Sequence, residues 1–320
     1  MYSVGIDLGG TNIAAGVVDL DTYKIVGKAS VPTDIPRPAE EIADSIKQVV
    51  LMALVEGSVL MDDIVSIGIG TPGAVTKGGV VEFAGNLGFV NTPLGELVSE
   101  RVEKKTYVGN DANCAALGEQ VAGCGDGVEN FIAVTLGTGV GGGIIVNNRL
   151  LTGINGAAGE IGHVVIDMGG EACTCGRAGC FEAYASATAL IRETKDALIR
   201  DRKKESLIWK IIDGSLENVN GKVPFDAAEE GDKIAKGVVD QYIHYLGIGC
   251  ANLINIFQPE YVIIGGGPSA QGDKLLDPVK RQLKREVFGG DTKTKVVIAK
   301  LGNSAGVIGA AMLGVINEND

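Results

Sequence analysis

A glycine-rich pattern occurs twice in the chain, and it limits the folds open to the sequence. The stretches "YSVGIDLGGTNIAAGVVDL" (2–20) and "NFIAVTLGTGVGGGIIVNNRLL" (130–151) both place glycines between two apolar runs and continue to a polar turn. Such runs predict strands, so each stretch is expected to form a strand–turn–strand meander. A dinucleotide-binding fingerprint would open a helix after its glycines, which disfavours an NAD site here. The repeat predicts two similarly built α/β halves.

The length of 320 residues is typical of two domains. Apolar spacing predicts an amphipathic helix over 38–57, and helices near 185–200 and 227–257. The stretch 64–71 reads as a buried strand, and a strand runs into a helix at Asn110 and Asp111. We place the domain limit near residue 112, giving a smaller domain over 1–112 and a larger one over 113–303. A last helix over 304–320 is expected to return to the first domain.

Charge and hydropathy exclude several classes of partner. The net charge of −12 argues against nucleic acid and anionic membranes as partners. The longest apolar run, "VVLMALV", is too short to cross a bilayer. No signal peptide is apparent in "MYSVGID", and together with free cysteines this favours the cytoplasm.

One segment, "EIGHVVIDMGGEACTCGRAGCFE" (160–182), concentrates metal-binding residue types. His163, Cys173, Cys175 and Cys180 offer the nitrogen and sulfur donors that Zn²⁺ prefers, with the spacing of a closed structural site. Three cysteines cannot all pair within the segment, so a disulfide leaves one thiol over. The alternative is a set of unrelated buried thiols. The remaining chemistry-bearing residues are expected to pack without a site role: Cys114, Cys124 and Cys250 as small buried side chains, and His244 on a helix.

Three glycine turns that follow apolar strands are candidates for binding phosphate through their backbone N–H groups. They are Gly9-Gly10-Thr11, Gly137-Thr138-Gly139 and Gly265-Gly266-Gly267. Ordinary hairpins explain any one of them equally well, and the lysine pattern of a P-loop is absent. Asp111 has two interpretations from the residues alone. It could be a general base, or it could be the N-cap of the helix that follows it.

Taken together, five motifs resemble the ROK family of bacterial sugar kinases and repressors. They are "DLGGTN" (7–12), "NDAN" (110–113), "LGTGVGGG" (136–143), "EIGH" (160–163) and "CTCGRAGCFE" (173–182). The match is closest to the glucokinase branch of that family. The resemblance implies a two-domain fold of the sugar kinase, actin and Hsp70 (ribonuclease H-like) type with a cleft between the domains. It also implies ATP with Mg²⁺, a structural zinc and a homodimer or homotetramer.

The same resemblance implies a role for each matching residue. The implied reaction is phosphorylation of D-glucose at its 6-hydroxyl by ATP, with Asp111 as the general base. The implied sugar-binding residues are Gly73, Asn86, Asn110, Asp111, Glu160, His163 and Glu182. The implied ATP-binding residues are Asp7, Gly9, Gly10, Thr11, Asn12, Gly137, Thr138, Gly139, Gly265 and Gly266, with Asp7 near the metal–phosphate.

Three other functions compete with this one. The chain could phosphorylate another hexose, such as fructose or N-acetylmannosamine. It could be a sugar-sensing regulator, but those carry a helix-turn-helix segment ahead of "DLGGTN", which begins here at residue 7. An Hsp70-like ATPase would leave the "EIGH" and cysteine block without a purpose. ATP and polyphosphate both stay open as the phosphoryl donor.

Overall fold

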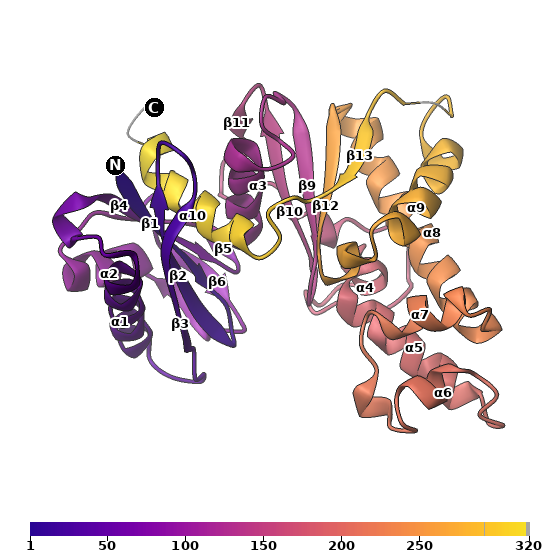
Figure 1. Cartoon of the computed structure of the whole chain (residues 1–320). Helices are drawn as coiled ribbons and strands as arrows, with labels where there is room; N and C mark the ends of the chain where they lie inside the picture. Colours follow the sequence, from indigo (N-terminus) through magenta and orange to yellow (C-terminus); the bar gives the residue numbers. More distant parts are fainter. Residues whose placement is uncertain (291, 318–320) are drawn as a thin grey trace. The chain divides into compact units, whose positions relative to one another are not determined.

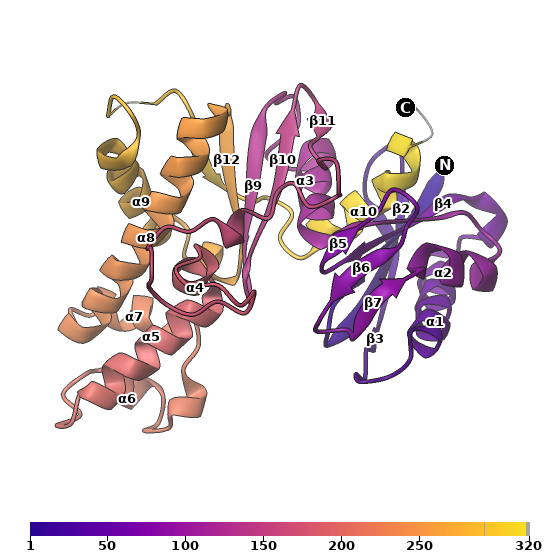
Figure 2. The ribbon, with the colours of Figure 1, turned by 180° about the vertical axis from the view of Figure 1, so that it is seen from behind.

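The computed structural model describes residues 1–290 and 292–317, which form two compact units (Figure 1 and Figure 2). Unit 1 comprises residues 1–133, 143–159 and the described residues from Lys300 onward. Unit 2 comprises residues 134–142 and the described part of 160–299. The expected α/β class is confirmed. The division groups residues 113–133 and 143–159 with the N-terminal residues, whereas the domain limit near residue 112 stays a prediction.

A five-stranded sheet of order β3-β2-β1-β4-β8 forms the centre of unit 1. Its strands are β1 (Tyr2–Leu8), β2 (Asn12–Asp19), β3 (Ile25–Pro32), β4 (Ile64–Thr71) and β8 (Thr106–Asn110). The helices of the unit are α1 (Ala39–Gly57), η1 (Met61–Asp63), α2 (Leu94–Val102), α3 (Asp111–Ala122) and α10 (Ser304–Asn317). A small second sheet, which the sequence did not predict, consists of β5 (Ala74–Val75), β6 (Val81–Ala84) and β7 (Phe89–Thr92).

The second five-stranded sheet has the order β11-β10-β9-β12-β13. Its strands are β9 (Phe131–Leu136), β10 (Val140–Val146), β11 (Arg149–Leu150), β12 (Tyr261–Gly266) and β13 (Lys295–Ile298). Counted in chain order, both sheets arrange their strands third, second, first, fourth, fifth. In the first sheet β1 pairs antiparallel with β2 and parallel with β4, and in the second β12 pairs parallel with β13. The two meanders and the repeat predicted from the sequence are therefore confirmed.

Alternating side chains give the first sheet two different faces. Val4 and Ile6 of β1 are fully buried in a core that includes α1 and α2. The apolar face predicted for α1 is buried in that core, at Ile42, Ile46, Val49, Val50, Ala53 and Leu54. Gly5 and Gly68 point to the other face, where an added methyl group would overlap the backbone of α10. Because glycine leaves room for this close approach, the face can be covered directly by a helix backbone.

α10 is the terminal helix expected over 304–320, and residues 318–320 lie outside the described residues. It packs against β1, β4 and α3. At the crossing with α3, Gly309 leaves no space for a methyl group beside the carbonyl of Cys114, and Gly118 has the same relation to the carbonyl of Ala305.

The helices of unit 2 are η2 (Ile161–His163), α4 (Glu182–Ala185), α5 (Ala187–Arg200), α6 (Ile208–Ile211), η3 (Leu216–Asn218), α7 (Val223–Glu229), α8 (Lys233–Phe257), η4 (Gly267–Gln271) and α9 (Asp273–Glu286). The longest of them, α8, packs against α4, α5, α7 and α9. Phe181, just before α4, is 1% exposed and lies against Gly249 of α8. α4 is thereby fixed on α8. Among the described residues, no helix has the length and apolar character needed to cross a membrane.

Candidate active site and metal centre

Three parallel strands of unit 1 end at one edge of the sheet, and polar residues gather there. In the register of the sheet, Asp7 of β1 lies beside Gly70 of β4, and the next residue, Thr71, lies beside Asn110 at the end of β8. α3 starts immediately afterwards with Asp111. The carboxyl ends of parallel strands are where α/β proteins bind ligands. The register thus brings two carboxylates, separated by about a hundred residues in sequence, to one potential binding edge.

Asn110, not Asp111, caps α3. Its side-chain oxygen accepts hydrogen bonds from the backbone N–H groups of Ala112 (3.0 Å) and Asn113 (3.1 Å). Its amide nitrogen donates to the carbonyl of Gly73 (3.2 Å). Asp111 is the first residue of the helix, and its carboxylate accepts a hydrogen bond from the N–H of Ala112 (2.8 Å). The interpretation of Asp111 as the N-cap is therefore wrong.

The environment of these carboxylates raises their pKa values. Part of the Asp111 residue faces solvent, but surrounding protein removes water from its carboxyl and raises the pKa, against a smaller lowering by the Ala112 N–H. Burial also raises the pKa of Asp7, and the negative charge of Asp111 raises it further. Behind them the fully buried Cys114 thiol has a pKa well above its ordinary value, because of burial and then the two carboxylates.

The first glycine turn lies at the same edge. The N–H of Gly9 donates to the carbonyl of Asn12 (3.0 Å), and the Thr33 hydroxyl donates to the carbonyl of Gly9 (2.6 Å). A methyl group on Gly10 would lie 3.5 Å from Nδ2 of Asn86. Unit 1 therefore brings together its nine sequence-predicted residues: Asp7, Gly9, Gly10, Thr11, Asn12, Gly73, Asn86, Asn110 and Asp111.

In unit 2 the second glycine turn lies against Glu182. The N–H of Gly137 donates to the carbonyl of Gly139 (3.0 Å), which closes a tight turn after β9. A methyl group on Gly139 would overlap Oε2 of Glu182. Gly266, with φ of 88°, approaches the carbonyl of Leu136 so closely that only glycine fits. The turns at 137–139 and 265–266 are therefore adjacent, as the sheet order β9-β12 requires.

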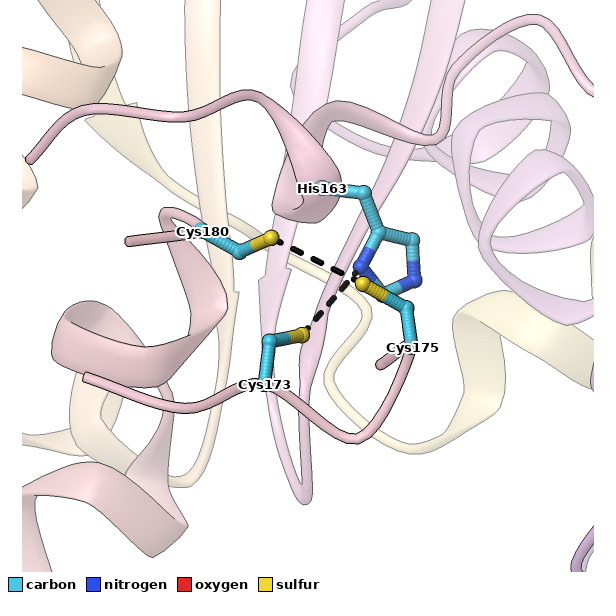
Figure 3. Close-up of side chains that lie close together, drawn as sticks. All are labelled: His163, Cys173, Cys175 and Cys180. Atoms are coloured by element: carbon cyan, nitrogen blue, oxygen red, sulfur yellow. Dashed lines mark hydrogen bonds between the residues drawn. The ribbon is translucent and has the colours of Figure 1, made fainter. Parts of the chain in front are cut away.

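The four predicted zinc ligands converge on one point (Figure 3). One ligand atom from each of His163, Cys173, Cys175 and Cys180 lies within 4.8 Å of all the others. The separation is 3.7 Å between the sulfurs of Cys175 and Cys180, and 3.6 Å between Nδ1 of His163 and the sulfur of Cys173. A tetrahedral zinc with Zn–S of about 2.3 Å and Zn–N of about 2.0 Å requires about 3.8 and 3.5 Å for these pairs. The donor set and its spacing therefore fit Zn²⁺.

The loop shifts the pKa values of its thiols in opposite directions. A backbone N–H from Arg177 to Cys175 lowers the pKa of that exposed thiol. Burial raises the pKa of Cys173 to about 12, and the Cys175 N–H opposes this rise. N–H groups directed at sulfur stabilise thiolates, the form that binds a metal.

Two glutamates flank His163. Nε2 of His163 lies 3.8 Å from Oε2 of Glu160, and Nδ1 lies 3.8 Å from Oε1 of Glu182. Oε1 of Glu182 also accepts from the Cys173 thiol (3.0 Å) and the Thr174 hydroxyl (3.1 Å). The predicted sugar residues Glu160, His163 and Glu182 therefore form one group that is continuous with the metal centre.

The other singled-out residues take ordinary positions. Cys114 and Cys250 are fully buried, as expected, and His244 is exposed beside Gln282. Cys124 is only half-buried, so the expectation that it is a buried side chain is wrong. Its N–H donates to Oε2 of Glu119, a buried residue in the last turn of α3, and a glycine-rich turn follows that helix.

Comparison with known proteins gives a consistent result. The ROK family model matches residues 3–315. A glucokinase of Streptomyces coelicolor is 40% identical over 314 residues, which cover 97% of this chain and 96% of that protein. A glucokinase of Halalkalibacterium halodurans is 39% identical over 325 residues, covering 99% and 96%. The crystal structure of a ROK family glucokinase from Streptomyces griseus, in complex with glucose and AMPPNP, aligns with a TM-score of 0.85 at 38% identity, covering 98% of this chain and 99% of that one.

Proposed function

This chain belongs to the ROK family, and from that premise we propose that it is a glucokinase, which transfers the γ-phosphoryl group of ATP to the 6-hydroxyl of D-glucose. Two relatives named glucokinase match almost its whole length, and the similar Streptomyces griseus structure holds glucose and a nucleotide. The observation that carries the proposal is the placement of Asp111. Its carboxylate lies at the carboxyl ends of parallel strands. Because Asn110 caps α3, helix capping does not account for the presence of Asp111 at this position.

Asp111 acts as the general base in this proposal. A sugar hydroxyl is too weak an acid to attack as a free alkoxide at neutral pH, so a nearby carboxylate accepts its proton as the new P–O bond forms. The raised pKa of Asp111 makes it a stronger base than an ordinary aspartate. α3 and Asn110 hold the residue rigidly, which keeps the carboxylate aligned with the hydroxyl.

ATP and Mg²⁺ fit the remaining groups. The N–H groups of the turns at 9–12, 137–139 and 265–266 suit phosphate oxygens, as glycine turns commonly do. Asp7 supplies a hard oxygen donor whose pKa burial and the charge of Asp111 both raise, so a cation there would relieve unfavourable charge. When bound, Mg²⁺ neutralises charge on the phosphoryl group that is transferred.

Glu160, His163 and Glu182 bind the sugar hydroxyls in this proposal, assisted by Gly73, Asn86 and Asn110. Zinc is structural: His163 and the three cysteines provide four ligands, which leaves no position for water. The distance from Nδ1 of His163 to the Cys173 sulfur supports Nδ1 as the metal-binding atom, and Nε2, which lies near Glu160, is then left for the sugar. We further propose a cytoplasmic homodimer or homotetramer.

A coupled assay of ADP release tests the proposal. Glucose, fructose and N-acetylmannosamine are compared, each with ATP or polyphosphate and with or without Mg²⁺. We expect the highest kcat/KM with glucose, ATP and Mg²⁺. Asp62→Asn serves as the control for loss of an exposed carboxylate, because Asp62 lies before the amino end of β4, at the opposite end of that strand from the site. Preference for another hexose would assign that sugar instead, and no phosphorylation of any hexose would reject the kinase.

A further inference from the structure

The loop that carries the three cysteines is shaped by contacts independent of any metal. Its two ends pair through a bridge between Val165 and Cys180, and the N–H of Gly179 donates to the carbonyl of Glu171 (2.7 Å). Within the loop, the N–H of Gly170 donates to the carbonyl of Asp167 (3.0 Å) and closes a turn. This turn over 167–171 is separated from Cys173 by Ala172 alone.

The hydroxyl of Tyr184 holds both ends of that turn. It donates to Oδ2 of Asp167 (2.9 Å) and accepts from the N–H of Glu171 (2.7 Å). A methyl group on Gly170 would overlap the hydroxyl oxygen, so the backbone passes as close to it as a glycine permits. A phenylalanine would fill the same space for packing, but it would leave the Glu171 N–H without this acceptor.

The tyrosine itself is firmly anchored. Its residue is 8% exposed, and its ring packs on that of Tyr245 in α8 with 4.2 Å between centroids. It lies in α4, two residues after Glu182, which contacts Cys173 and Thr174 on the same loop. α4 therefore contacts the loop at two places. The Tyr184 hydroxyl is hydrogen-bonded to the turn at 167–171, and Glu182 contacts Cys173, the first of the three cysteines.

We propose that Tyr184 is a positioning residue, whose hydroxyl sets the conformation of the metal loop and thereby the alignment of Glu182 and His163 towards the sugar. The sugar part of this inference rests on the proposed function. Without the hydroxyl, the turn at 167–171 becomes more mobile. Cys173 follows this turn and contacts Glu182, so the positions of the metal ligands and of Glu182 become less well fixed. The consequence is weaker sugar binding and faster loss of the metal, with little change in the phosphoryl-transfer step.

The test compares Tyr184→Phe with Tyr242→Phe. Tyr242 is also buried and its hydroxyl donates one hydrogen bond, to the carbonyl of Ala185 (2.8 Å) and not to the loop. For Tyr184→Phe we expect the KM for glucose to rise about tenfold, while kcat stays within about threefold, as suits the loss of two hydrogen bonds outside the reacting atoms. Release of zinc to a chromogenic chelator is expected to be about tenfold faster, and amide hydrogen exchange over 166–180 to accelerate.

Tyr242→Phe is expected to lower the melting temperature while leaving the glucose KM and the exchange of 166–180 unchanged. Asp167→Asn, which keeps an oxygen for the Tyr184 hydroxyl, is expected to retain a near-normal KM. Wild-type KM and exchange in Tyr184→Phe, or the same changes in Tyr242→Phe, would overturn the proposal. Hydrogen exchange needs no sugar, so absence of glucose phosphorylation in the wild type would reject the proposed function while the exchange data still decide the role of Tyr184.

Discussion

Replacing Asp111 by Asn separates the chemistry of this side chain from its place in the fold. The amide is nearly isosteric and can still accept from the Ala112 N–H, and the cap on α3 is held by Asn110. The helix therefore keeps its bonds, whereas proton acceptance by the carboxylate is lost. We expect kcat to fall by about 10²–10⁴-fold, the range for loss of a general base, with a much smaller change in the glucose KM.

The change in stability that we expect for Asp111→Asn is neutral or favourable. The folded protein raises the pKa of Asp111, so the folded chain binds that proton more tightly than the unfolded chain. Between the unfolded and the folded pKa, the contribution of the group to the free energy of unfolding therefore falls as pH rises, and above both values the ionised carboxylate destabilises the fold. Asn removes this penalty. At neutral pH we expect a melting temperature equal to or above wild type, a difference that disappears below the ordinary aspartate pKa of 3.8.

Measuring kcat and the melting temperature on the same preparations between pH 4 and 8 (roughly the range that covers a raised carboxyl pKa) checks both expectations. In the wild type, kcat should fall as the pH decreases through a value above 3.8, because protonated Asp111 cannot act as a base. A variant that keeps near-normal turnover would refute the base assignment. A loss of about 1 kcal/mol of stability, equivalent to roughly 2–4 °C, would instead indicate that the ionised carboxylate stabilises the fold, contrary to its raised pKa.

Three further substitutions, the last with a matched control variant, test other parts of the structure. Cys175→Ser is expected to abolish retention of about one zinc per chain and weaken glucose binding; metal analysis checks this, and retained zinc would contradict the four-ligand site. Gly139→Ala would push a methyl group into Glu182, so we expect the glucose Kd from calorimetry to rise about tenfold; an unchanged Kd would remove Glu182 from the sugar site. Gly309→Ala overlaps a carbonyl of α3 and should lower the free energy of unfolding by about 1–3 kcal/mol. Gly237→Ala, which meets nothing within 4 Å on α8, should raise it by up to about 1 kcal/mol in denaturant titrations, and equal effects would contradict the packing argument.

Local pattern predicted most of the elements, because apolar periodicity reflects the face that a helix or strand buries. α1 illustrates this, with each residue of its predicted apolar face in the core. β5, β6 and β7 were missed because strands of two to four residues are too short to show a period. The capping role of Asn110 was also missed, since both it and Asp111 have side chains suited to an N-cap.

The site itself was predicted only as a set of motifs. Spacing identified the metal ligands, because all four lie within one loop and its flanking turn. The proximity of Asp7 to Asp111 depends on the register of β1, β4 and β8, which no local pattern contains. The contact of Tyr184 with Asp167 joins residues that show no shared motif, so only the folded loop reveals it.

α10 is synthesised after all the strands of the sheet that it covers, and this sheet contains β1. At 5–20 residues per second, on the order of ten seconds separate the synthesis of α3 from that of Ser304. During this interval the glycine-lined face of β1 and β4 lacks its cover, whereas the residues of unit 2 are complete by Ala299. A chain terminated before Ser304 is therefore expected to leave unit 1 as a substrate for chaperones and proteases.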